Sequence, residues 1–126
     1  MEIIYRLTEA ESKLMTIIWA HTPIPSPELI KIAAHELGWK RTTTYTILKK
    51  ICGKGIASFD NATVTAAVTL DEFNAGQSRC FVEDTFGGSL PMFIASFIGG
   101  GKLTTAQAAE LRSLIEEHEE GRNSDG

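Results

Sequence analysis

The chain has 126 residues, with 43% hydrophobic and 22% charged side chains and a formal net charge of −4. This length fits one domain or two small halves, and the apolar fraction is ordinary for a globular protein and argues against disorder. No apolar run is long enough to cross a bilayer, and the first residues lack the layout of a signal peptide, so a cytoplasmic location without membrane contact is expected. Cys52 and Cys80 show no pairing pattern, which favours reduced thiols.

The charges are unevenly distributed along the chain. Residues 1–60 carry eight Lys or Arg and six acids, whereas residues 61–126 carry four Lys or Arg and ten acids. A polyanion would therefore meet the first half of the chain, and the second half would face away from it.

Two helices are predicted before residue 39. Thr8 and Glu11 have the spacing of a capping box at the start of the first helix, which ends at the proline-containing residues 22–25. Ser26 is expected to cap the second helix, and Gly38 is expected to end it. Apolar residues at helical spacing give each helix one buried face.

A third helix is predicted within residues 40–54, which hold five basic residues and no acid. Its apolar positions fall on one face, and its Thr, Tyr and Lys positions fall on the other. Phosphates attract the cations, and short hydroxyl side chains can reach base edges in the major groove. The candidate DNA-binding residues are Lys40, Arg41, Thr42, Thr43, Tyr45, Thr46, Lys49, Lys50 and Lys54.

Two short β-prone runs, residues 56–59 and 63–68, flank an Asp-Asn-Ala turn and predict a hairpin. Three helices followed by a hairpin indicate a winged helix, with the second and third helices as a helix-turn-helix. The predicted fold is therefore mainly α with a small β-hairpin: an N-terminal winged helix-turn-helix followed by C-terminal dimerisation helices. The expected division is a DNA-binding domain over residues 1–69, a dimerisation domain over 70–120 and a disordered tail over 121–126.

Helical patterning resumes after the hairpin, with capping residues at Thr69, Ser89 and Thr104 and a glycine joint at residues 99–101. The apolar surface of these helices is too large for them to hide from each other, which predicts a symmetric homodimer. A ligand pocket among the aromatic residues 86–97 is the alternative. The candidate dimerisation residues are Phe73, Phe81, Phe86, Leu90, Phe93, Ile94, Phe97, Leu111, Leu114 and Ile115.

No catalytic or cofactor site is expected. His21, His35 and His118 lack metal-ligand spacing, and no nucleophile lies near a base in the sequence. The glycines at 99–101 lack the Lys-Ser/Thr pair of a phosphate-binding loop. The interpretation is a non-enzymatic protein without metal or cofactor.

Four segments stand in a characteristic order. They are Leu7-Thr8-Glu9-Ala10-Glu11, Ile18-Trp19, Phe86-Gly87-Gly88-Ser89-Leu90 and Ala95-Ser96-Phe97. With them, the chain resembles the penicillinase repressor family of bacterial regulators from about Leu7 to Glu117. The resemblance implies a winged-helix dimer that sits on a palindromic double-stranded DNA operator and blocks transcription. In family members that control β-lactamase genes, a membrane sensor triggers cleavage between the two halves.

The chain departs from the family pattern at three places. Lys40 replaces the usual Ser before the third helix, so the cap is expected to move to Thr42. The hairpin from Asp60 to Ala67 has no Lys or Arg, which weakens the expectation of a wing contact to DNA. Relatives are cut at an Asn-Phe pair near this position, but the residues here are Ser96-Phe97, so induction by that route is not expected. The absence of Cys-x-Cys pairs argues against copper sensing.

The sequence therefore predicts a dimeric transcriptional repressor. An upstream sensor or protease is left open as a partner. The alternative is a winged-helix protein-interaction module that no longer reads DNA, which the uncharged hairpin favours.

Overall fold

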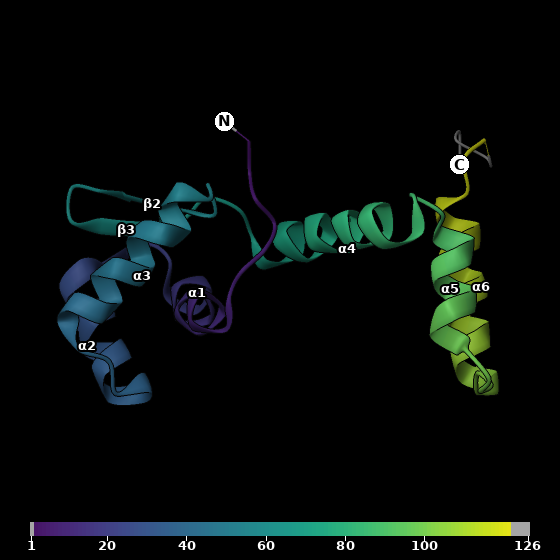
Figure 1. The fold of residues 1–126 in the computed structure, drawn as a ribbon, viewed down its shortest axis with the longest axis horizontal. Helices are drawn as coiled ribbons and strands as arrows, with labels where there is room; N and C mark the ends of the chain where they lie inside the picture. Colours follow the sequence, from purple (N-terminus) through teal and green to yellow (C-terminus); the bar gives the residue numbers. More distant parts are fainter. Residues whose placement is uncertain (1, 122–126) are drawn as a thin grey trace.

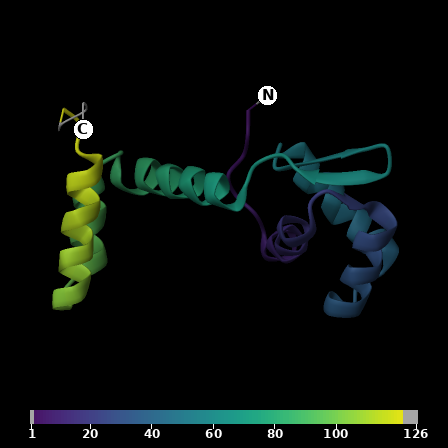
Figure 2. The same cartoon turned by 180° about the vertical axis from the view of Figure 1, so that it is seen from behind.

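The computed structural model describes residues 2–121, in which a compact head lies at one end and three further helices extend from it (Figure 1). The view from behind shows the same arrangement, with the head and the last two helices at opposite ends of a long connecting helix (Figure 2). The predicted tail, apart from Gly121, lies outside the described residues. Among residues 2–121, none of the helices combines the length and apolar character needed to cross a membrane.

The head contains three helices and three strands in the order expected of a winged helix. Its elements are α1 (Glu9–His21), β1 (Ile24–Pro25), α2 (Ser26–Leu37), α3 (Arg41–Gly53), β2 (Ala57–Asp60) and β3 (Thr63–Ala66). The helices that follow are α4 (Leu70–Phe86), α5 (Leu90–Ile98) and α6 (Thr105–His118). The predicted mainly α fold with a small hairpin, an N-terminal winged helix and C-terminal helices is confirmed.

Polar side chains start most of the helices as predicted. Thr8, Thr69 and Thr104 each form a complete capping box with the residue three positions later. The Ser89 hydroxyl accepts a hydrogen bond from the Met92 amide at 3.2 Å and caps α5. These bonds satisfy backbone N–H groups that would otherwise lack a partner in the first helical turn.

Two predicted caps are wrong. Pro25 is the N-cap residue of α2, and Ser26 is the first helical residue, with a buried side chain. The Ser26 amide donates to the Ala62 carbonyl at 2.8 Å, and its hydroxyl accepts from the Tyr45 hydroxyl at 3.4 Å. Lys40, not Thr42, is the N-cap residue of α3, and no side chain caps that helix. Ser26 thus joins α2 to the hairpin and to α3.

One apolar core holds the head together, with α1 packed against both α2 and α3. Its fully buried members include Leu14 and Ile18 of α1, Leu48 and Ile51 of α3, and Val64 of β3. Each such side chain contributes about 1.5–3 kcal/mol relative to an exposed one.

The three strands form an antiparallel sheet in the order β1-β3-β2. The hairpin was predicted, but β1 was not, because Ile24 lies between Pro23 and Pro25, and these prolines indicated only the end of a helix. Ile24 of β1 and Phe59 of β2 both pair with Val64, which places β3 in the centre. The sheet therefore ties the chain before α2 to the hairpin after α3.

The start of α4 is packed onto the head. The Trp19 indole N–H donates to the Val68 carbonyl at 3.0 Å, and the Trp19 ring lies 5.5 Å from the Phe73 ring. Phe73 is 4% exposed and belongs to the head core. Its prediction as a dimerisation residue is therefore corrected, because its side chain is already covered within the chain.

The hairpin turn offers a test of the backbone geometry. Asn61 and Ala62 have φ values of 55° and 57°, as a type I′ turn requires. Alanine in this region is strained by about 1 kcal/mol, whereas glycine is not. Ala62→Gly should therefore raise the free energy of unfolding by about 1 kcal/mol, measured by urea denaturation. In the matched control, Gly38→Ala at φ 68° should lower the free energy of unfolding. An Ala62→Gly variant no more stable than the parent would contradict the strain assigned to Ala62.

Candidate nucleic-acid interface

The outer face of α3, consisting of Thr42, Thr43, Thr46, Lys49 and Lys50, is exposed to solvent. The opposite face is anchored in the core through Thr44, Leu48 and Ile51. Thr44 is buried without an unpaired polar group, because its hydroxyl donates to the Lys40 carbonyl at 3.1 Å. The helix therefore presents its hydroxyl and cationic side chains outward as the sequence indicated.

Positive charge surrounds this outer face. Lys40 and Arg41 are exposed at the start of α3, and Lys49 and Lys50 are exposed near its end. The sequence has no acidic residue between Leu37 and Phe59, so no carboxylate of this segment neutralises them. Such a patch on a net acidic chain attracts polyanions locally.

The threonine hydroxyls of the outer face differ in whether they are hydrogen-bonded within the chain. Thr46 donates its hydroxyl proton to the Thr42 carbonyl at 2.9 Å. Within the described residues, the hydroxyls of Thr42 and Thr43 have no hydrogen-bond partner. These two side chains are free to hydrogen-bond an external ligand.

Tyr45 lies at the edge of the outer face and is half-buried. Its ring stacks on Phe59 of β2 at 6.1 Å, and the Arg41 guanidinium lies 5.5 Å from the ring centroid. Because its hydroxyl also donates to Ser26, Tyr45 serves mainly to join α3, α2 and the hairpin. The stack holds Arg41 at the start of α3.

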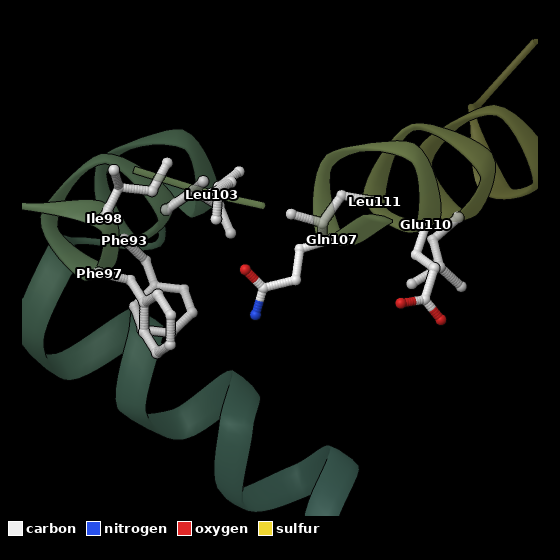
Figure 3. Close-up of a pocket in the computed structure, with 9 residues that line it drawn as sticks. Phe93, Phe97, Ile98, Leu103, Gln107, Glu110 and Leu111 are labelled. Carbon is white, nitrogen blue, oxygen red and sulfur yellow. The ribbon is translucent and has the colours of Figure 1, made fainter. Parts of the chain in front are cut away.

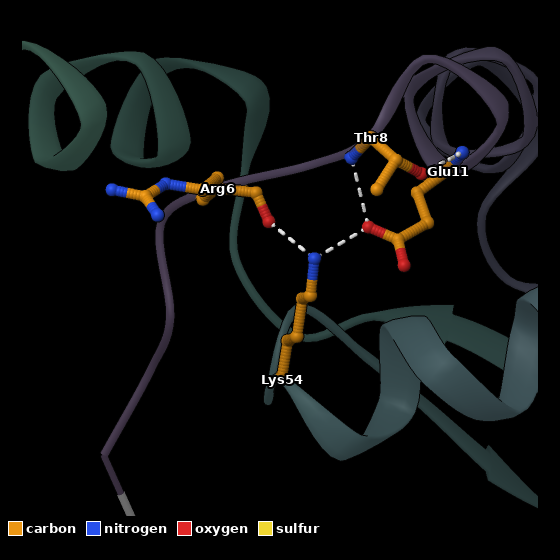
Figure 4. Close-up of polar contacts among 4 residues, drawn as sticks. All are labelled: Arg6, Thr8, Glu11 and Lys54. Atoms are coloured by element: carbon orange, nitrogen blue, oxygen red, sulfur yellow. Dashed lines mark hydrogen bonds and ion pairs between the residues drawn. The ribbon is translucent and has the colours of Figure 1, made fainter.

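Lys54 does not lie with the other candidate cations. Its ammonium donates to the Glu11 carboxylate at 2.5 Å and to the Arg6 carbonyl at 2.7 Å (Figure 4). The side chains of Lys54 and Glu11 are 21% and 3% exposed. The charge of Lys54 is therefore neutralised inside the head, and this residue is removed from the candidate DNA contacts.

The environment of Glu11 favours its charged form. Burial by itself raises the pKa of this carboxyl, but hydrogen bonds from Lys54 and from the Thr8 amide outweigh that effect, so its pKa lies below the usual value. Glu11 thus has two roles, since it completes the capping box of α1 and pairs with Lys54 across 43 positions of sequence.

Phe59 is a surface feature of the hairpin that the sequence did not single out. It is 43% exposed, next to Tyr45 and Lys49 in a shallow hollow. The β-prone run of residues 56–59 was the available signal, but it did not show that Phe59 meets α3. The hairpin therefore presents an aromatic ring rather than a cation beside the outer face.

A second candidate site is the apolar cleft between α5 and α6. Phe93, Phe97 and Ile98 line it from α5, and Leu111 and Gln107 line it from α6 (Figure 3). Its volume is about 410 Å³. Neither helix contains a single buried residue among those described. The cleft is therefore an unfilled apolar surface rather than the centre of a packed helix pair.

The other candidate dimerisation residues lie on the same helices or on the end of α4. Phe81, Leu90, Phe97, Leu114 and Ile115 are between 50% and 76% exposed. Phe81, Phe86 and Phe93 form an aromatic cluster with ring distances of 5.7–6.0 Å. All the candidates except Phe73 thus lie outside the head, on α5, α6 or the last turns of α4.

Comparison with known proteins decides the family. A model of the penicillinase repressor family matches residues 7–117, which is most of the chain. The chain belongs to the penicillinase repressor family. Penicillinase repressor family members are transcriptional regulators rather than enzymes, so membership supports a repressor role.

The chain is also similar to an individual member of the penicillinase repressor family. The penicillinase repressor of Bacillus licheniformis is 25% identical over 122 residues, which cover 94% of this chain and 95% of that protein. The similarity therefore includes both the head and the C-terminal helices.

The pairing of Glu11 with Lys54 predicts a dependence of stability on pH. Glu11→Gln should lower the free energy of unfolding by about 2 kcal/mol at pH 7, since loss of one partner leaves a partly buried charge unpaired. Because the pKa of Glu11 is lowered in the folded state, the advantage of the parent is complete above about pH 5 and declines as the pH falls through that pKa.

Urea denaturation between pH 7 and pH 3 measures this difference. Glu9→Gln is the matched control, because Glu9 is 88% exposed and pairs with Lys13 only at the surface, at 3.7 Å. A difference between the parent and Glu11→Gln that stayed constant down to pH 3 would rule out the stated role of the Glu11 charge.

Proposed function

We propose that this chain is a transcriptional repressor that binds a palindromic DNA operator as a homodimer, with one α3 in the major groove at each half-site. The observation that carries the proposal is the outer face of α3, which turns hydroxyl and cationic side chains to solvent from a firmly anchored helix. Membership of the penicillinase repressor family supports it. Bound repressor would act by excluding polymerase from a promoter.

The side chains of α3 divide by reach and chemistry. Arg41, Thr42, Thr43 and Thr46 are the proposed contacts to bases, because guanidinium and hydroxyl groups match the hydrogen-bonding edges of the major groove. Exposed Lys40, Lys49 and Lys50 are the proposed contacts to phosphates, which fix position without reading sequence.

The proposed dimer contact is the apolar surface of α5, α6 and the end of α4. Two helices without a buried residue cannot stabilise each other sufficiently, whereas a second copy inserted in the cleft would cover both. The heads would then lie away from the contact, since α4 spans about 25 Å at 1.5 Å per residue. This division favours residues 1–69 as the DNA-binding part and residues 70–120 as the dimerisation part.

A protein-interaction module is the second candidate function. The observation that favours it is the hairpin, which has no Lys or Arg between Asp60 and Ala67 and exposes Phe59 instead. A fluorescence titration with random-sequence duplex at low salt separates the two, because a DNA-binding protein binds it weakly and an interaction module does not.

Substitution of Lys50 tests the phosphate contacts. Lys50→Ala should weaken binding to all duplexes alike and reduce the slope of log K against log salt by about 1. Lys102→Ala removes the same charge from an exposed position outside the head and is the matched control. Equal salt slopes for Lys50→Ala and the parent would count against the placement of α3 on DNA.

Substitution of Phe97 tests the dimer contact. Phe97 is 76% exposed within α5, and Phe97→Asp would place a charge in the proposed contact. The dimer dissociation constant should rise about 100-fold, equivalent to about 3 kcal/mol, as measured by sedimentation equilibrium. Leu70→Asp is the control, because Leu70 is 47% exposed at the end of α4 that adjoins the head, away from the proposed contact. If Phe97→Asp sedimented as the parent does, the contact would lie elsewhere.

A further inference from the structure

The N-terminal strap, residues 2–7, leads into α1 and passes close to the start of α4 (Figure 1). Its side chains alternate, with Ile3, Tyr5 and Leu7 packed against the core while Ile4 and Arg6 are exposed. This period of two is typical of extended chain with one buried side.

On one side, the strap is bonded to the end of α3. The Ile4 amide donates to the Lys54 carbonyl at 3.0 Å, and the Arg6 carbonyl accepts from the Lys54 ammonium at 2.7 Å. Lys54 follows directly after the last residue of α3. The position of the strap therefore follows that of α3.

On the other side, the strap packs on α4 through Tyr5. A Cβ atom at Gly76 would lie 2.4 Å from the Tyr5 ring, so only glycine permits this contact. The Tyr5 ring also lies 6.2 Å from the Phe73 ring, one helical turn earlier. Glycine is unfavourable inside a helix, and the close approach of Tyr5 accounts for its presence here.

We propose that the N-terminal strap fixes the angle between α3 and α4, and that it thereby sets the spacing and orientation of the two α3 helices on DNA. This inference rests on the proposed function for its consequence on DNA, but its geometric part does not. Tyr5 is the positioning residue, and Gly76 is the surface that receives it.

The length of α4 makes this angle important. A rotation of about 10° at the head would move the far end of a helix about 25 Å long by about 4 Å. That displacement exceeds the rise of about 3.4 Å between successive base pairs. Phe73 and Trp19 hold α4 at one point, and Tyr5 at Gly76 adds a second point that resists rotation about the first.

Spin labels test the geometry without DNA. One label is attached at Lys50→Cys on the outer face of α3 and one at Cys80, which is exposed on α4, in a Cys52→Ala background diluted with unlabelled chain. The parent should give a narrow distribution of distances. Tyr5→Ala should widen it at least two-fold, and Tyr5→Phe, which keeps the ring, should restore the parental width.

Two further variants complete this experiment. Ile4→Ala is the matched control, because it truncates a side chain of the strap that is 51% exposed and should leave the width unchanged. Gly76→Ala disturbs the same contact from α4 and should widen the distribution as Tyr5→Ala does. A parental width in a folded Tyr5→Ala or Gly76→Ala variant would overturn the proposal. Global unfolding of both variants would also overturn it, because the strap would then support the whole fold rather than one angle.

A series of operators tests the consequence on DNA. Duplexes carrying two selected half-sites at separations that change by one base pair should show at least a ten-fold preference for one separation in the parent. Tyr5→Ala should reduce that preference to three-fold or less, with unchanged affinity for a single half-site. Equal losses on every duplex would overturn the proposal, whereas absence of DNA binding by the parent would refute the proposed function and leave the label distances as the test of the strap.

Discussion

The packing of the inner face of α3 against α1 is the contact on which the arrangement of the head depends. Leu48 and Ile51 are buried with Leu14 and Ile18, so the rotation of α3 about its own axis is fixed by apolar burial. A shift of one position would turn the helix by about 100° and bring Lys49 toward the core. The exposed hydroxyl and cationic face is therefore a consequence of the core.

Local patterns predicted most of the fold. The capping boxes act over three residues, and the two faces of α3 follow from a repeat of 3.6, so both are visible in the sequence. Contacts between distant positions were not visible. Lys54 looked like one more DNA-binding cation, because nothing local shows that its partner is Glu11, and Tyr45 looked free because Ser26 was assigned to a cap.

The same limit applies to the C-terminal helices. Composition indicated an excess of apolar surface, and the exposed side chains of α5 and α6 agree with it. Composition could not separate Phe73, which contacts Trp19 and Tyr5 in the head, from Phe81 only two turns further along α4. Whether an aromatic residue serves the head or the contact between copies depends on where α4 leaves the head.

The bond from the Thr46 hydroxyl to the Thr42 carbonyl has a consequence for the choice of base. A hydroxyl whose proton is engaged by its own helix can only accept a hydrogen bond from elsewhere, and its methyl group is held in one direction. In the major groove, adenine and cytosine offer amino groups and thymine offers a methyl, whereas guanine offers two acceptors. In the proposed complex, Thr46 would therefore discriminate against guanine at the position it faces.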